Sequence, residues 1–143
     1  SILLGNYTSG EAGSSAFASY PGNPSVFSTA GDVWVNITSG SNASPSSSNF
    51  GGQVLIHELG HAIGLAHPGD YNADAETRIT YAEHAEYYQD TRQYTVMSYF
   101  SETNTGANYQ GRYASVPMLD DIRGAQIEYG ANMSTRTGDT VYG

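Results

Sequence analysis

The sequence predicts a mixed α+β domain, and three patterns support that prediction. Short β-prone runs occupy the N-terminal part, an apolar stripe with helical spacing covers Phe50 to Leu65, and a second helical pattern follows Pro117. Elsewhere Gly, Ser, Asn and Tyr occur in short clusters typical of loops. A length of 143 residues suits one compact domain or part of a larger one.

The N-terminal part contains three candidate strands. Ile2 to Tyr7 is a short apolar run, Ser15 to Tyr20 carries β-prone residues up to Pro21, and Val33 to Ile37 has apolar residues at alternate positions. The next segment, Thr38 to Asn49, has no apolar periodicity. We predict a flexible surface loop there, with a disordered tether as the alternative.

The first predicted helix covers Phe50 to Leu65. Its apolar residues Val54, Leu55, Ala62 and Leu65 fall on one helical stripe, which indicates a buried helix. The polar, Tyr-rich stretch from Asp70 to Gln93 is predicted to be a loop with at most a short helical turn.

The second predicted helix ends at Tyr129, before Gly130. Ser115 is a possible cap, and Asp120 and Asp121 lie near the positive end of the helix, where acidic side chains are favourable.

Composition excludes several classes of partner and site. Fourteen acidic residues against five arginines give a net charge of −9, so nucleic acid and anionic membrane surfaces are poor partners. No run approaches the ~20 apolar residues that a membrane helix needs. The chain has no cysteine, so a metal here must use histidine, carboxylate or hydroxyl ligands.

Three histidines lie in one string, HELGHAIGLAH, at His57, His61 and His67. Helix positions four apart differ by about 40° in azimuth, so the first two imidazoles share one face and can bind one ion. His67 cannot join them on a continuous helix, and the chain must turn between them. Gly64 can adopt positive φ and make that turn.

Three imidazoles around Zn²⁺ leave one position open, as catalytic zinc requires. Glu58 points beside the site and is the candidate general base for a water molecule activated by the metal. The alternatives are ordinary helix histidines, or a structural zinc, which needs a fourth protein ligand and has no use for the glutamate. The fourth histidine, His84, has no partner at ligand spacing and is predicted to be solvated.

A family resemblance supports the zinc interpretation. The string HELGHAIGLAHPGDYNA matches the long zinc signature of the metzincins, and its tail HPGDYNA resembles the serralysin branch, secreted bacterial metalloendopeptidases also called alkaline proteases. The segments ILLGNY, YTVMSYFSETNTG, YASVPMLDDI and IEYGANMSTRTGDTVYG also resemble serralysin segments, in the family's order. The resemblance implies a metzincin-type protease domain, with a mixed twisted sheet, an active-site helix and a C-terminal helix, truncated at the N-terminus.

The resemblance also implies roles for individual residues. Met97 would form an apolar floor beneath the imidazoles, and Tyr99 would ligate the resting metal. When a peptide carbonyl displaces it, the Tyr99 hydroxyl could donate to the developing oxyanion. Asp70 either accepts a hydrogen bond that helps to orient the loop below His67 or is a simple turn residue.

Two further sites are implied by the resemblance. Ala16, Phe17 and Ala18 would form an edge strand with which an extended substrate pairs, although an ordinary interior strand is the alternative. RTGDT resembles the opening of a calcium-binding repeat domain, in which the backbone oxygens of Arg136, Gly138 and Thr140 would contribute to a Ca²⁺ site of the full-length protein.

The chain also departs from the serralysin pattern. Serralysins carry an N-terminal stretch and a glycine-rich repeat domain that have no counterpart here, so we expect residues 1–134 to be the central and C-terminal part of a protease domain and residues 135–143 the truncated start of the repeat domain. The chain lacks an initiator methionine and is expected to begin inside a precursor. The missing remainder of the chain is then a possible partner. Glu83 to Gln89 lies where family members pass more directly from TYAE to DTR, so the loop near the cleft is not predicted.

The predicted function is a zinc-dependent, secreted bacterial endopeptidase that acts on proteins or peptides. Its zinc ligands would be His57, His61 and His67, and Glu58 would be its general base. One alternative is a non-catalytic autolysis fragment that retains zinc or peptide binding. Another is a calcium-dependent binding module, which rests on RTGDT and general acidity alone.

Overall fold

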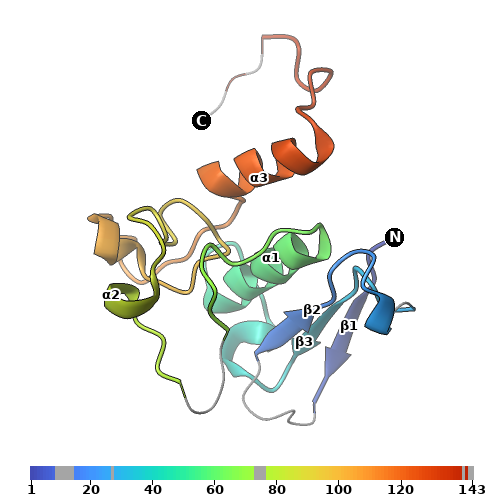
Figure 1. Cartoon of the computed structure of the whole chain (residues 1–143), viewed down its shortest axis with the longest axis horizontal. Helices are drawn as coiled ribbons and strands as arrows, with labels where there is room; N and C mark the ends of the chain where they lie inside the picture. The colour runs from blue at the N-terminus through green and yellow to red at the C-terminus, as the bar shows by residue number, and fades with distance from the viewer. Residues whose placement is uncertain (9–14, 27, 73–76, 140, 142–143) are drawn as a thin grey trace.

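A three-stranded sheet forms the N-terminal part of the computed structural model, which describes residues 1–8, 15–26, 28–72, 77–139 and 141. The central strand β3 (Val33–Asn36) pairs in parallel with β1 (Leu4–Tyr7) and antiparallel with β2 (Ala16–Ala18) (Figure 1). The three predicted strands are therefore confirmed, and the sheet is mixed. β2 lies at one edge of this sheet.

Helix α1 (Phe50–Ala62) packs against β2 and β3. It begins at Asn49, whose side chain accepts a hydrogen bond from the Gly52 N–H at 2.9 Å, as an N-cap residue does. It ends three residues before the predicted Leu65. Of the predicted stripe, only two residues are buried, because the rest of the inward face is glycine and polar side chains; the buried set is Gly51, Gln53, Val54, Glu58, Gly60, His61 and Ala62.

The segment before α1 is better packed than predicted. It contains a 3-10 turn, η2 (Gly40–Ala43), and Asn42 within it is buried. The Asn42 amide donates to the backbone oxygens of Ser15 at 2.8 Å and Asn36 at 3.2 Å. Most of the segment is exposed, as predicted for a surface loop, but the alternative of a disordered tether is wrong, because the buried Asn42 amide binds the backbone beside β2 and β3.

Residues 77–118 are mostly irregular and contain the short helix α2 (Tyr81–His84) and the 3-10 turn η3 (Glu102–Thr105). A further 3-10 turn, η1 (Pro24–Val26), follows β2. The predicted loop with a short helical turn is thus confirmed for residues 77–93, whereas residues 73–76 lie outside the described part of the chain. Three apolar side chains of this region belong to the buried core, namely Val96, Met97 and Phe100.

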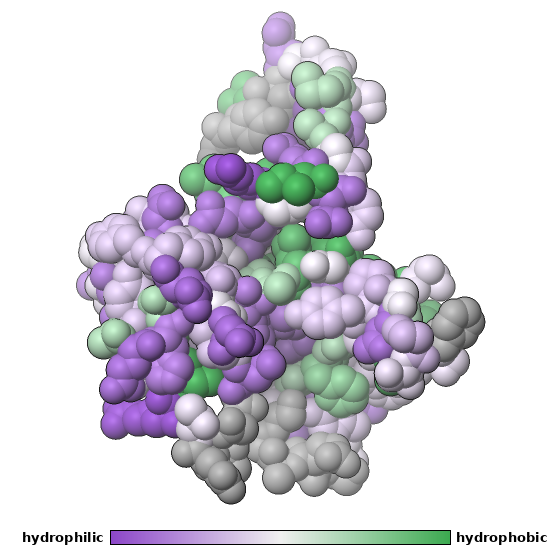
Figure 2. All heavy atoms as spheres, viewed as in Figure 1, coloured by the Kyte–Doolittle hydropathy of each residue, from purple (hydrophilic) through white to green (hydrophobic). Residues whose placement is uncertain are grey.

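Helix α3 (Leu119–Tyr129) confirms the second predicted helix, but its cap is Met118 and not Ser115. The Asp121 carboxylate, in the first turn of the helix, accepts a hydrogen bond from the Met118 N–H at 2.7 Å. This bond gives a partner to a backbone N–H at the start of the helix. Apolar side chains of α3 remain exposed, among them Leu119 and Ile127. Figure 2 shows this face of the molecule to be mostly hydrophilic, with hydrophobic residues in small patches.

Residues 131–139 follow α3 as exposed chain without regular structure. Within the part of the chain that the structure describes, none of the helices has the length and apolar character that crossing a membrane requires.

Candidate metal centre

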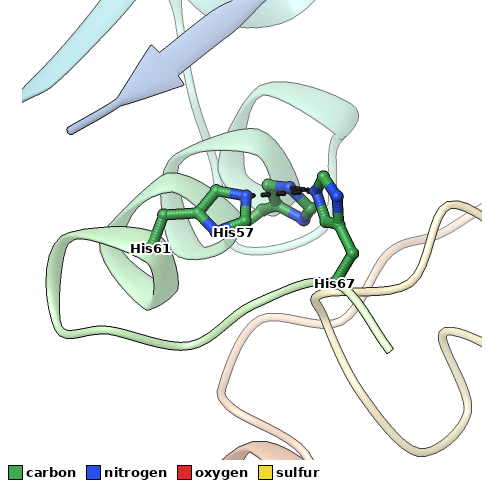
Figure 3. A group of neighbouring side chains, drawn as sticks. All are labelled: His57, His61 and His67. Carbon is green, nitrogen blue, oxygen red and sulfur yellow. Dashed lines mark hydrogen bonds between the residues drawn. The ribbon is translucent and has the colours of Figure 1, made fainter. Parts of the chain in front are cut away.

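Three imidazoles from two different segments meet at one point. His57 and His61 project from α1, and His67 comes from the irregular chain that follows the helix (Figure 3). The Nε2 atom of His67 lies 3.1 Å from the Nε2 atoms of both other histidines, and the three candidate ligand atoms all lie within 4.8 Å of one another. Nitrogens around a tetrahedral zinc with Zn–N bonds of about 2.0–2.1 Å are about 3.3 Å apart. The spacing of these atoms therefore fits one metal ion.

Hydrogen bonds fix the protonation of all three rings. Each Nδ1 atom faces a backbone carbonyl, of Val96 for His57 at 2.8 Å, of Leu65 for His61 at 2.7 Å, and of Tyr71 for His67 at 2.8 Å. A carbonyl only accepts, so each Nδ1 carries a proton and each neutral ring presents an Nε2 lone pair.

Burial keeps these rings neutral. It lowers the pKa of His57 to about 3 and lowers the pKa values of His61 and His67 as well. Three lone pairs therefore converge with no proton to share between them, and a cation is the species that satisfies such a set. The observation argues against ordinary helix histidines.

A Schellman turn brings the third histidine back to the helix. The Leu65 N–H donates to the Gly60 carbonyl and the Gly64 N–H to the His61 carbonyl, both at 2.9 Å. Gly64 has a φ of +101°, which side chains other than glycine rarely adopt. The turn also places the Leu65 carbonyl on His61 Nδ1. The predicted reversal at Gly64 is confirmed.

The segment with Met97 lies against α1. Met97 is 2% exposed, and a Cβ atom added at Gly60 would collide with its sulfur. The carbonyl of the neighbouring residue Val96 accepts from His57 Nδ1. The same carbonyl also accepts a hydrogen bond from Gln53 Nε2 at 3.1 Å. Glycine at position 60 is thus what lets the buried methionine approach the helix between two of the histidines.

Asp121 ties this segment to α3. Its carboxylate accepts the Val96 N–H at 2.9 Å and the Thr95 hydroxyl at 2.6 Å, and it is almost fully buried. The Val96 carbonyl that orients His57 is therefore held in place by a residue of α3. The sequence suggested only a favourable charge at the helix start, because hydrogen bonds between distant segments leave no periodic signal.

Glu58 is buried beside the histidines, with 7% of its surface exposed. Burial raises its pKa to about 7. A carboxyl group with a pKa close to neutral can both accept and return a proton, as general acid–base catalysis requires.

Two tyrosines lie against the rings of the histidine cluster. The ring of Tyr99 lies edge-on to His67, with 4.6 Å between centroids, and 5.8 Å from that of His57. Tyr20, which follows β2, lies edge-on to His61 at 5.4 Å, and its pKa is raised by burial and by the charge of Glu58. Sequence reasoning named Tyr99 but missed Tyr20, because a tyrosine among twelve carries no signal of its own.

The remaining predicted residues lie in different surroundings. Asp70 is exposed, and it is the Tyr71 carbonyl that accepts from His67, so Asp70 has the role of a turn residue. His84 is half-buried in α2 rather than solvated, since its Nδ1 lies 3.2 Å from the backbone oxygen of Thr80. Arg136 and Gly138 are exposed, and Thr140 lies outside the described residues.

Comparison with known proteins also relates this chain to metallopeptidases. Residues 7–126 match the model of the family described as metallo-peptidase family M12B reprolysin-like. The chain is 50% identical over 131 residues to Serralysin C of Dickeya chrysanthemi, an alignment that covers 92% of this chain and 26% of that protein.

Two further relatives agree with this match. Serralysin A of Dickeya chrysanthemi is 52% identical over 131 residues, which cover 92% of this chain and 26% of the relative. The metallopeptidase AprA of Pseudomonas marginalis is 48% identical over 146 residues, or 99% of this chain and 30% of the relative. The chain thus spans less than a third of the length of these relatives, and its predicted resemblance to serralysins is confirmed.

Proposed function

Because this chain belongs to the reprolysin-like M12B family of metallopeptidases, we propose that it forms the catalytic part of a zinc-dependent endopeptidase that hydrolyses internal peptide bonds of proteins. The observation that carries the proposal is the convergence of three neutral imidazoles beside a buried carboxyl group. We further propose a metzincin-type arrangement, with a twisted sheet, α1 as active-site helix and α3 as C-terminal helix.

The residues present fit a catalytic zinc ion. His57, His61 and His67 would hold it through Nε2, and their hydrogen bonds to carbonyls preset the tautomer that a metal ligand needs. When bound, zinc polarises a carbonyl oxygen and lowers the pKa of a water molecule to roughly 7. Among the described residues three histidines converge without a fourth His or acidic ligand, and the chain has no cysteine, which favours an open, catalytic site over a structural one.

Glu58 is proposed as the general base. Its carboxylate would take a proton from the attacking water and later return it to the leaving amine. Burial supports this role, because it raises the pKa of Glu58 to about 7 and so brings it near the operating range. No residue of the chain needs to form a covalent bond to the substrate.

Tyr99 is proposed to ligate the resting metal and to stabilise the tetrahedral oxyanion through its hydroxyl group. Its ring contacts those of His57 and His67, so the side chain lies at the cluster. Its backbone is held by Arg92, whose guanidinium donates to the Tyr99 carbonyl at 2.9 Å. A fixed backbone with a half-buried ring suits a side chain that must move over a short path.

The edge strand β2 is proposed to bind substrate. An extended peptide can pair with an edge strand such as Ala16, Phe17 and Ala18 through its backbone, whatever its side chains. Support comes from the position of β2 at the sheet edge and from its packing against α1, which carries two of the histidines. Broad sequence tolerance would follow.

The remaining expectations concern the whole protein. We propose that residues 1–134 belong to the protease domain and that residues 135–143 begin a calcium-binding repeat domain, with Arg136, Gly138 and Thr140 among its ligands. The exposed chain after α3 supports a boundary there. We also propose secretion from a bacterial cell, which the resemblance to serralysins implies.

The proposed function is tested by loading the full chain with zinc and incubating it with casein. Cleavage that stops on chelation and returns with zinc is expected. Glu58→Gln should bind zinc normally but lose about 10²–10⁴-fold in rate, as removal of a general base does. Glu128→Gln, which alters an exposed glutamate of α3, is the matched control. Zinc binding without any cleavage would instead favour the non-catalytic fragment.

A further inference from the structure

The third histidine has no helix to hold it. His57 and His61 are fixed by α1, whereas His67 belongs to irregular chain. Two contacts with Tyr71 orient its ring. The Tyr71 carbonyl accepts the His67 Nδ1 proton at 2.8 Å, and the two rings stack at an interplanar angle of 11° with 5.4 Å between centroids. The direction of the His67 Nε2 lone pair therefore depends on where Tyr71 lies.

Tyr71 is itself anchored from a distant part of the chain. Its side chain is 5% exposed, and its hydroxyl donates to the Asp90 carboxylate oxygen Oδ1 at 2.8 Å. The Ser98 side chain and the Tyr99 backbone also hydrogen-bond to this phenol, so its one oxygen atom joins three segments of the chain.

Asp90 is unusual among the acidic residues of the described chain. It is fully buried, and its second oxygen, Oδ2, has no hydrogen-bond partner among the described residues. A buried carboxyl group is costly unless its oxygens have hydrogen-bond partners, and the Tyr71 hydroxyl is the partner of Oδ1. The bond from Tyr71 is therefore strongly favoured, which restricts the positions that Tyr71 can take.

We propose that Asp90 is a positioning residue for the metal site: its buried carboxylate, acting through the Tyr71 phenol, fixes the carbonyl and the ring that orient His67, and so raises the affinity for zinc. The inference rests on the zinc site of the proposed function. Asp90 lies 23 positions after His67 in the sequence and carries out this role without touching the metal or the substrate.

The test measures the zinc dissociation constant of the full chain by competition with a chromophoric chelator. The variants are Asp90→Ala, Tyr71→Phe and the double variant, with Asp90→Asn as the conservative change that keeps an acceptor at Oδ1. Tyr81→Phe is the matched control, because that hydroxyl also donates to a nearby oxygen, the Tyr88 carbonyl at 2.7 Å, but has no bond to the histidine segment. Visible absorption of the Co²⁺-substituted protein reports the ligand geometry separately.

Asp90→Ala and Tyr71→Phe should each weaken zinc binding about 10–100-fold, the range seen when partners of metal ligands are removed. The double variant should bind no more than about threefold more weakly than the weaker single variant, because both changes remove one linkage. Asp90→Asn and Tyr81→Phe should stay close to the unsubstituted chain. The Co²⁺ spectrum should change in the two weakened single variants and in the double variant, and should stay unchanged in Asp90→Asn and Tyr81→Phe.

The alternative is that Asp90 only stabilises the fold. In that case Asp90→Ala would lower the free energy of unfolding of the zinc-free chain yet leave the zinc affinity and the Co²⁺ spectrum unchanged, and the proposal is overturned. If Asp90→Ala does not fold, Tyr71→Phe decides the question, since it keeps the ring and the carbonyl. An unsubstituted chain that binds no zinc would overturn the proposed function itself, which is a different result.

Discussion

The turn at Gly64 offers a direct test of how the metal site is assembled. Replacing Gly64 by alanine adds a Cβ atom whose nearest neighbour outside the turn is Pro21 Cγ at 3.9 Å, an ordinary van der Waals contact. The substitution therefore creates no collision. Its effect comes from the backbone alone, because φ at this position is +101°.

The expected size follows from that backbone conformation. A left-handed conformation costs an L-residue roughly 1–2 kcal/mol. We expect the strain to relax in the zinc-free protein by a shift of the turn, which carries both the Leu65 carbonyl and the chain leading to His67. Zinc binding must then restore the turn, so Gly64→Ala should weaken zinc binding about 5–30-fold.

The assay is chelator competition in the full chain, with Gly106→Ala as the control. Gly106 also has positive φ, +92°, and a Cβ atom there meets no described atom within 4 Å, but it ends η3 rather than α1. The control should lose stability to urea without losing zinc affinity. Equal zinc affinity in both variants would show that the positive φ at Gly64 does not position His67.

Three further predictions concern the rest of the site. Asp121→Ala should lower the free energy of unfolding by about 2–4 kcal/mol in urea titrations, because it leaves buried donors unpaired; Asp120→Ala, on the same helix turn, should change it by less than about 1 kcal/mol. In the zinc-free chain, the raised pKa of Glu58, about 7 against 4.5, contributes stability below pH 4.5 that is lost as the pH rises towards 7. Relative to the unsubstituted chain, the free energy of unfolding of Glu58→Gln should therefore rise by up to about 3 kcal/mol between pH 4.5 and 7. A difference that does not depend on pH would contradict the burial argument. Zinc at about 1,000 times its dissociation constant should raise the free energy of unfolding by about 4 kcal/mol, and His67→Ala should abolish most of that gain; an equal gain in His67→Ala would remove this residue from the ligand set.

The sequence predicted the strands and the grouping of the three histidines well, because both are encoded locally. The three strands are short β-prone runs, and His57, His61 and His67 lie within eleven residues of one another. The need for a turn at Gly64 also followed from helix geometry, since a continuous helix carries the third ring to the wrong side.

What the sequence did not predict depends on hydrogen bonds between distant segments. Asn42 is polar and lies in a Ser-rich stretch, yet it is buried because its amide satisfies backbone oxygens at Ser15 and Asn36. Asp90 and Asp121 are acidic residues in an acidic chain, and nothing in their spacing distinguishes them from solvated carboxylates. Hydrophobic periodicity detects apolar burial, so buried polar groups escape it.

The distribution of the carbonyl acceptors explains why the site needs so much of the chain. The three Nδ1 protons go to Val96, Leu65 and Tyr71, which belong to different segments, and two of these segments are fixed by the buried carboxylates of Asp121 and Asp90. Bringing three Nε2 lone pairs together without a cation is unfavourable, so these anchors must hold the rings in place before the metal arrives. We therefore expect the three nitrogens to occupy the same positions in the metal-free and the metal-bound protein. We accordingly expect zinc affinity in this chain to depend on the loops after α1 as much as on the histidine string itself.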